Sequence, residues 1–214
     1  MEKIKGLSEQ HQKLWEKCAP LLAEGRARDL THAKDLLGLI LDWQEKKGSL
    51  DLDVLIPVAM MHDIGHSSMI DEHFREPEKQ EGLRADKLPH MITGSRIAEQ
   101  FLTEINYDPQ KAKEVIELVK MHDYYWMNGE QAQKAYDTNN KKAFHDLDVL
   151  VTMVDKDRLK KLKKICPNRE EFLKVIGHQL NLFFFDEFKN AAKRAMHELV
   201  DYQEAYGTFR EPSD

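Results

Sequence analysis

Apolar residues recur at intervals of three and four along most of the chain, and this spacing restricts the fold more than any other feature. Such a period places apolar side chains on one face of an α-helix, whereas no stretch alternates convincingly with the period of two that marks a half-buried strand. We therefore predict an all-α protein. Helices are expected over residues 7–23, 31–43, 52–62, 92–105, 109–122, 142–164 and 186–206, with a further helix capped by Asn168.

Length and charge restrict the class of protein. A chain of 214 residues suits one domain, so we predict a single domain over residues 1–214. The net charge of -6 lacks the basic excess typical of proteins that bind nucleic-acid polymers. The longest apolar run, Val54 to Met61, contains Pro57 and is too short to span a membrane. With only two cysteines and a polar start, the chain is expected to be cytoplasmic.

Residues 64–89 form the longest stretch that is not readily helical. They contain two glycines, two prolines and many charged residues. Loops of this length inside compact domains are uncommon and are usually functional or disordered. We therefore expect a loop here, and the sequence leaves its role open.

Four histidines follow one another at intervals of about 30 residues, which is one helix plus a connection. In an all-α bundle this interval lets each helix contribute one or two inward ligands to a shared site. Asp63 follows one of these histidines directly, and Asp155 ends an apolar run one interval after the last of them. The histidines are His32, His62, His90 and His122.

These residue types point to metal chemistry. Neutral imidazole is the commonest metal ligand, and carboxylates also bind divalent cations. Four histidines and two aspartates exceed what one tetrahedral zinc site requires. They suit two ions with open positions, and two ions about 3.5–4 Å apart can clamp the attacking and leaving oxygens of a phosphoryl transfer.

Three segments around these residues resemble the HD-domain superfamily, which is best known for metal-dependent phosphohydrolases. Residues 60–66, MMHDIGH, are similar to the family's LLHDIGH segment. Residues 88–95, LPHMITGS, resemble its H…GA segment with serine in place of alanine. Residues 154–159, VDKDRL, resemble its closing ADRL segment with two residues inserted. With His32 before them, the resemblance covers about residues 31–159, and it implies an HD-domain helical bundle with the metal site at its core. We expect the C-terminal helices over 168–207 to pack on this bundle.

The resemblance implies a role for each matched residue. His32, His62, Asp63 and Asp155 would hold a first divalent metal ion. His90 and His122 would hold a second, with Asp63 bridging the two and an activated water as nucleophile. His66 stands where part of the family has a substrate-binding lysine, so it is expected to bind phosphate or protonate a leaving group. Trp126 is a weaker candidate for substrate binding.

Three functions follow from this resemblance and stay open at the level of sequence. The first is a hydrolase of a small phosphate ester or nucleotide. The second is a mixed-valent di-iron oxygenase, which uses the same six ligands in some HD proteins. The third is a non-catalytic metal-binding sensor. The sequence does not fix the metal, because such sites accept Fe, Mn, Co, Ni, Mg or Zn.

The remaining histidines and aromatic residues are expected to have structural roles. We interpret His11, His145, His178 and His197 as structural or solvated, and His73 as a residue of the 64–89 loop. The run from Phe183 to Phe185 is expected in the core or in a homodimer interface, and the oligomeric state stays open.

Overall fold

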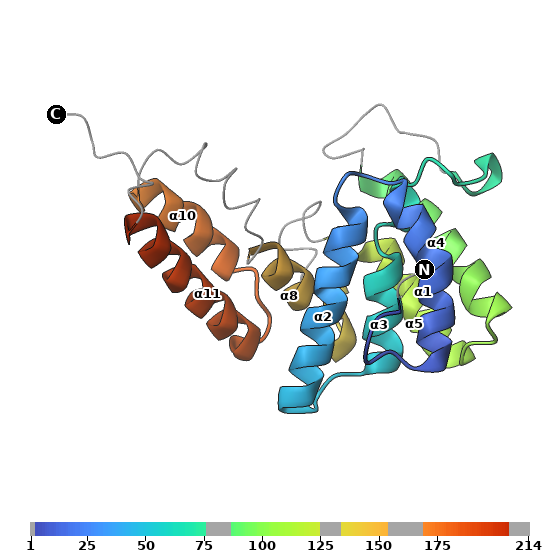
Figure 1. Ribbon diagram of the computed structural model, residues 1–214, viewed down its shortest axis with the longest axis horizontal. Coiled ribbons are helices and arrows are strands. Elements are labelled where there is room, and N and C mark those ends of the chain that lie inside the picture. The colour runs from blue at the N-terminus through green and yellow to red at the C-terminus, as the bar shows by residue number, and fades with distance from the viewer. Residues whose placement is uncertain (1–2, 76–86, 125–133, 154–168, 206–214) are drawn as a thin grey trace. The chain divides into compact units, whose positions relative to one another are not determined.

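The all-α prediction is confirmed (Figure 1). The structure, a computed structural model, describes residues 3–75, 87–124, 134–153 and 169–205, and no strand occurs among them. The chain divides into two compact units, residues 1–144 and 145–214, which are described separately below. The single domain expected from sequence stays a prediction.

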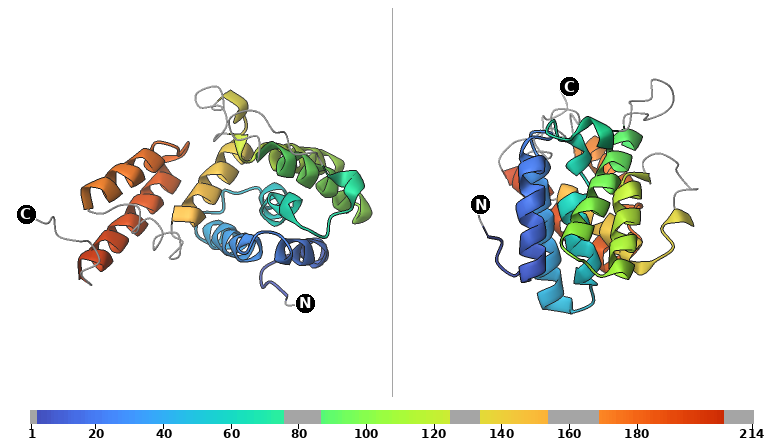
Figure 2. Two further views of the ribbon diagram at one scale, coloured as in Figure 1. Left: turned by 90° about the horizontal axis from the view of Figure 1, so that it is seen from above. Right: turned by 90° about the vertical axis from the view of Figure 1, so that its right-hand side faces the viewer.

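The first unit is built around one apolar helix. The left view of Figure 2 shows helix α3 nearly end-on between the pair α1–α2 and the pair α4–α5, and α3 packs against all four. Residues 54–61 of α3 are all buried, as expected for a helix that is apolar on every side. The bounds are α1 Glu9–Ala23, α2 Asp29–Lys47, α3 Leu52–Met61, α4 Lys87–Glu104 and α5 Pro109–Met121.

Local sequence signals explain several helix ends. Ser8 caps α1 by accepting a hydrogen bond from the backbone N–H of His11. Asp108 caps α5 through the N–H groups of Gln110 and Lys111, as the Asp108-Pro109 pair predicts. Gly48 ends α2 in the left-handed conformation, with φ of 65°, which a residue without Cβ adopts without strain.

The expected loop over residues 64–89 contains more helix than the sequence indicated. Two short 3-10 helices, η1 Ile64–His66 and η2 Glu72–Phe74, lie in its first part. Helix α4 begins at Lys87, five residues before the predicted start at Ile92. Pro89 lies in the first turn, where a helix does not need its N–H, so the proline does not delay the start of the helix.

Helix α8 (Asn139–Met153) begins in the first unit and continues into the second. The second unit also contains α10 (Arg169–Leu180) and α11 (Asp186–Ala205). Helices α10 and α11 pack against each other (Figure 1). The fully buried carboxylate of Asp146 accepts hydrogen bonds from the N–H groups of Phe184 and Phe185 just before α11 begins. The neighbouring His145 is buried and donates from Nε2 to the carbonyl of Leu182 at 3.2 Å. This second His-Asp pair is therefore structural.

Among the described residues, no helix is both long enough and apolar enough to cross a membrane.

Candidate metal centre

Two of the predicted histidines directly follow a helix. His62 comes after the last residue of α3, and its Nδ1 donates to the Ala59 carbonyl at 3.2 Å. His122 follows α5 in the same way and donates to the Val119 carbonyl at 2.8 Å. A carbonyl only accepts, so Nδ1 carries the proton and Nε2 keeps its lone pair for a metal. The end of the helix thus fixes both the tautomer and the direction of each ring.

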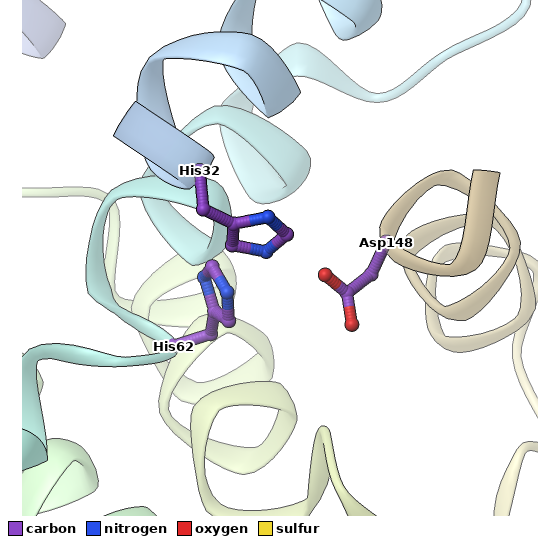
Figure 3. A group of neighbouring side chains, drawn as sticks. All are labelled: His32, His62 and Asp148. Carbon is purple, nitrogen blue, oxygen red and sulfur yellow. The ribbon is translucent and has the colours of Figure 1, made fainter. Parts of the chain in front are cut away.

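His32 lies in the first turn of α2, beside His62. Figure 3 shows the two imidazoles next to each other, and their ring centroids are 5.1 Å apart with an edge-on arrangement. His62 is buried, whereas His32 is half-buried. The structure therefore brings together the two histidines that the resemblance assigned to the first metal.

Asp63 lies at the centre of the imidazoles, and its two carboxylate oxygens face different histidines. Oδ2 is 3.4 Å from Nε2 of His62. Oδ1 is 3.7 Å from Nε2 of His122 and 4.0 Å from Nε2 of His90. His66, at the end of η1, places its Nε2 3.7 Å from the same Oδ1. Each oxygen of this carboxylate therefore faces a different group of imidazole nitrogens.

His90 and His122 are the closest pair of ring nitrogens in the cluster. Their Nε2 atoms are 3.2 Å apart, and both side chains are buried. Two nitrogens bound to one metal at about 2.0–2.1 Å each stand roughly 3 Å apart, so the pair fits one ion. In the described part of the chain, the buried Nε2 of His66 and Nδ1 of His90 have no hydrogen-bond partner. The facing Nε2 atoms of His90 and His122 are the pair that fits a divalent cation.

The electrostatics of the site favour a charged Asp63 and neutral rings at His66 and His90. Burial opposes the charge on Asp63, yet His62 and His122 hold the pKa of its carboxyl well below the usual range. Burial, together with the neighbouring His122 and His66, lowers the pKa of His90 to about 2. Burial and the charge of Arg26 lower the pKa of His66 to about 4. Metal ligands must be deprotonated, so the charged carboxylate and the neutral imidazole are the forms that bind a metal ion.

The sequence prediction did not include three residues of this region: Asp123 and Arg26, which reach the cluster directly, and Asp29, which contacts Arg26. Asp123 places Oδ2 3.6 Å from Nε2 of His90 and 3.9 Å from Nε2 of His122. Arg26 donates from Nη2 to Oδ2 of Asp63 at 2.6 Å and is itself bonded to Asp29. Asp123 could have been found as a His-Asp pair at 122–123, whereas no motif marks Arg26 or Asp29.

Gly65 allows η1 and α4 to cross at close range. A Cβ on Gly65 would stand 1.9 Å from the carbonyl oxygen of His90 and 2.9 Å from the backbone nitrogen of Gly94. No side chain fits there, because both contacts are with backbone. This crossing brings His66 onto His90, with the rings stacked at 4.0 Å.

The remaining predicted site residues lie outside the part of the chain that the structure describes. Asp155 and Trp126 are in this group. Figure 3 also labels Asp148, a carboxylate of α8 that the sequence prediction did not include. It lies one turn after Phe144 on the continuous helix α8, and the ring of Phe144 contacts His62 at 5.5 Å between centroids.

Some histidines outside the cluster can be compared with the sequence interpretation. His11 is buried and bonds through Nε2 to the Tyr107 hydroxyl at 2.9 Å, so it is structural. His197 and His73 are exposed, and the side chain of His178 is not among those described.

A comparison with protein families agrees with this geometry. The model of a family described as HD domain matches residues 29–157, more than half of the chain. The chain belongs to the HD-domain family. HD domains bind divalent metals and are mostly metal-dependent hydrolases, although some members are non-catalytic. No curated protein and no solved structure matches the chain significantly.

Proposed function

We propose that this HD-domain protein is a phosphohydrolase that uses two divalent metal ions and acts on a small phosphate ester or nucleotide. The observation that carries the proposal is the position of Asp63. Its Oδ2 faces His62, while its Oδ1 faces His90 and His122. One carboxylate can therefore join two groups of imidazoles, an arrangement that suits two metal ions close enough for phosphoryl transfer.

Each residue has a role in this proposal. His62, with His32, would hold one ion at Oδ2 of Asp63. His90 and His122 would hold the other at Oδ1, with Asp123 as an additional ligand. When bound, two such ions lower the pKa of water and offset the charge on the phosphoryl group. His66, whose side chain is 20% exposed, lies at the edge of the cluster and is placed to contact the substrate; as a proton donor it would first have to be protonated beside the bound phosphate.

The closing carboxylate of the first metal site has two candidates. The resemblance in sequence favours Asp155. We add Asp148 of α8 as a second candidate, because it lies one turn after Phe144 on that helix. We retain both as alternatives for the same role.

The proposed partner is a small phosphorylated molecule. The donor set of histidines and aspartates also suits two irons, so the di-iron oxygenase is the alternative that an experiment must separate. A metal-binding sensor would keep the ions and lack turnover. We propose a homodimer as the oligomeric state. We also propose Trp126 as a residue that contacts the substrate.

Metal analysis of the full chain tests the proposal first. Protein purified anaerobically without added metal is analysed by mass spectrometry for ions per chain and by EPR after partial oxidation. Two ions without a mixed-valent iron signal, followed by phosphate release from a panel of nucleotides and phosphomonoesters, would support the phosphohydrolase. A mixed-valent signal with oxygen uptake would replace it by the oxygenase. Protein that takes up no metal after reconstitution would contradict every metal-dependent function proposed here.

A further inference from the structure

Arg26 reaches the candidate metal centre from the connection between α1 and α2. Its Nη2 donates to Oδ2 of Asp63 at 2.6 Å. Its Nε donates to Oδ1 of Asp29 at 2.9 Å, and its backbone N–H donates to Oδ2 of the same aspartate at 2.8 Å. One carboxylate therefore holds both the backbone and the side chain of Arg26 and sets the direction of the guanidinium.

This arrangement is built into the surrounding chain. The side chain of Asp29 is only 4% exposed. A Cβ on Gly25 would stand 2.7 Å from Oδ2 of Asp29, so the glycine leaves room for that carboxylate. The carbonyl of Glu24 accepts hydrogen bonds from the N–H and the hydroxyl of Ser68, at 3.1 and 3.2 Å. The connection is thus fixed to the segment that follows η1.

Arg26 lies on the solvent side of the buried carboxylate. Its side chain is 54% exposed, whereas that of Asp63 is 9% exposed. A ligand that approaches Asp63 from solvent on this side meets the guanidinium first. Arginine suits such a position because its planar fork of N–H donors matches the oxygens of phosphate and carboxylate groups.

A cation at Asp63 changes what Arg26 can bind. The Nη2 donor is directed at Oδ2, the same oxygen that faces His62. A divalent ion shared by His62 and Asp63 supplies the positive charge that Arg26 otherwise supplies to that carboxylate. The guanidinium, still held through Nε by Asp29, then has donors for an anionic oxygen beside the ion.

We propose that Arg26, oriented by Asp29, is the anion-binding residue of this centre and contacts a phosphoryl oxygen of the substrate. This inference rests on the proposed phosphohydrolase function and names the group that selects for a phosphorylated ligand. Asp29 acts as a positioning residue, because it acts on the anion only through Arg26.

The test measures binding of inorganic phosphate to the full chain loaded with Mn²⁺, by isothermal titration calorimetry, after the metal content of each variant is known. Arg26→Gln is expected to keep the wild-type metal content and to weaken phosphate binding by roughly tenfold or more, as the loss of a charged hydrogen bond predicts. Arg26→Lys should retain part of the affinity. Arg28→Gln removes the same charge two residues away and serves as the control for long-range electrostatics.

Asp29→Asn separates positioning from net charge. This variant removes a negative charge near the site, so electrostatics alone predicts tighter phosphate binding. Our proposal predicts weaker binding, because the guanidinium loses its orientation. Wild-type affinity in Arg26→Gln, equal losses in Arg26→Gln and Arg28→Gln, or tighter binding in Asp29→Asn would overturn the role of Arg26. Loss of metal uptake by the wild-type chain would instead overturn the proposed function on which it rests.

Discussion

Nε2 of His90 faces Nε2 of His122 at 3.2 Å, and both nitrogens lie within 4.0 Å of Oδ1 of Asp63. His90 comes from the first turn of α4 and His122 from the end of α5, the two helices of one packed pair. The pair is therefore placed by tertiary packing, and its spacing suits one metal ion.

The first prediction follows from this pair. His90→Ala and His122→Ala each remove a ligand from the second site and none from the first, so we expect the metal content to fall from two ions per chain to one. Asp63→Asn is expected to lower occupancy of both sites, because Asp63 would serve both ions. Mass spectrometry of the purified variants, with circular dichroism to check folding, measures this.

A matched control for the metal variants is His11→Ala. His11 is a buried histidine of the same unit, bonded to Tyr107. The His11→Ala variant should lower the free energy of unfolding and leave the metal content unchanged. If His11→Ala and His90→Ala lost metal equally, loss of ions would reflect stability and the assignment of the second site would be wrong.

The second prediction decides between the two closing carboxylates. Asp148→Asn and Asp155→Asn keep nearly the same side-chain shape and remove one negative charge each. Only the variant that removes a metal ligand should lose the first ion. We expect its metal affinity to fall at least tenfold, because even residues that only support the ligands cost about 10–100-fold when they are changed. Titration with Mn²⁺ followed by EPR of the unbound ion measures the affinity. Equal, wild-type affinity in both variants would exclude both residues as ligands.

The third prediction concerns the crossing of η1 and α4. Gly65→Ala places a Cβ against the backbone of His90 and Gly94, which cannot move aside as a flexible side chain could. We expect the free energy of unfolding to fall by about 3 kcal/mol or more, at the upper end of the range for overpacking. Urea unfolding followed by circular dichroism measures the change.

Gly38→Ala is the matched control for this variant. Gly38 lies inside α2, and a Cβ there would meet nothing within 4 Å. Alanine is a better helix former than glycine, so this variant should gain about 0.5–1 kcal/mol. A loss of similar size in both variants would show that the close approach at Gly65 is not the cause.

The fourth prediction concerns the pH dependence of the second unit. Burial lowers the pKa of His145 to about 4, below the value near 6.5 of an unfolded histidine. The folded state therefore favours the neutral ring. Its stabilising contribution is present above pH 6.5 and is lost as the pH falls from 6.5 to 4, by about 3 kcal/mol.

His145→Gln should remove the histidine's contribution, because glutamine does not titrate and can still donate to the Leu182 carbonyl. The neighbouring Asp146, whose pKa burial raises to about 7, titrates in both proteins. Amide hydrogen exchange of peptides from α10 and α11, at pH values from 7.5 to 4.5 and corrected for intrinsic rates, measures the histidine's contribution. We expect the wild type to lose protection more steeply than the variant as the pH falls. The same slope in both proteins would contradict the assignment.

Local sequence signals predicted the helices well where the cause of the boundary is itself local. The Asp108-Pro109 pair gave the start of α5, and the apolar run after Asp51 gave α3. The start of α4 was placed five residues late, because Pro89 looked like an interruption and is tolerated in a first helical turn. The predicted cluster of His32, His62, Asp63, His66, His90 and His122 lies together within the first unit.

The sequence by itself determined the helical class and the ligand types, because period and residue chemistry are properties of short segments. Only the tertiary structure decided which donors meet. Asp123 reaches His90 because α4 packs on α5, and Arg26 reaches Asp63 because the connection before α2 is fixed beside η1. Contacts between residues more than 30 apart depend on helix packing, and no local pattern in the chain records their distance.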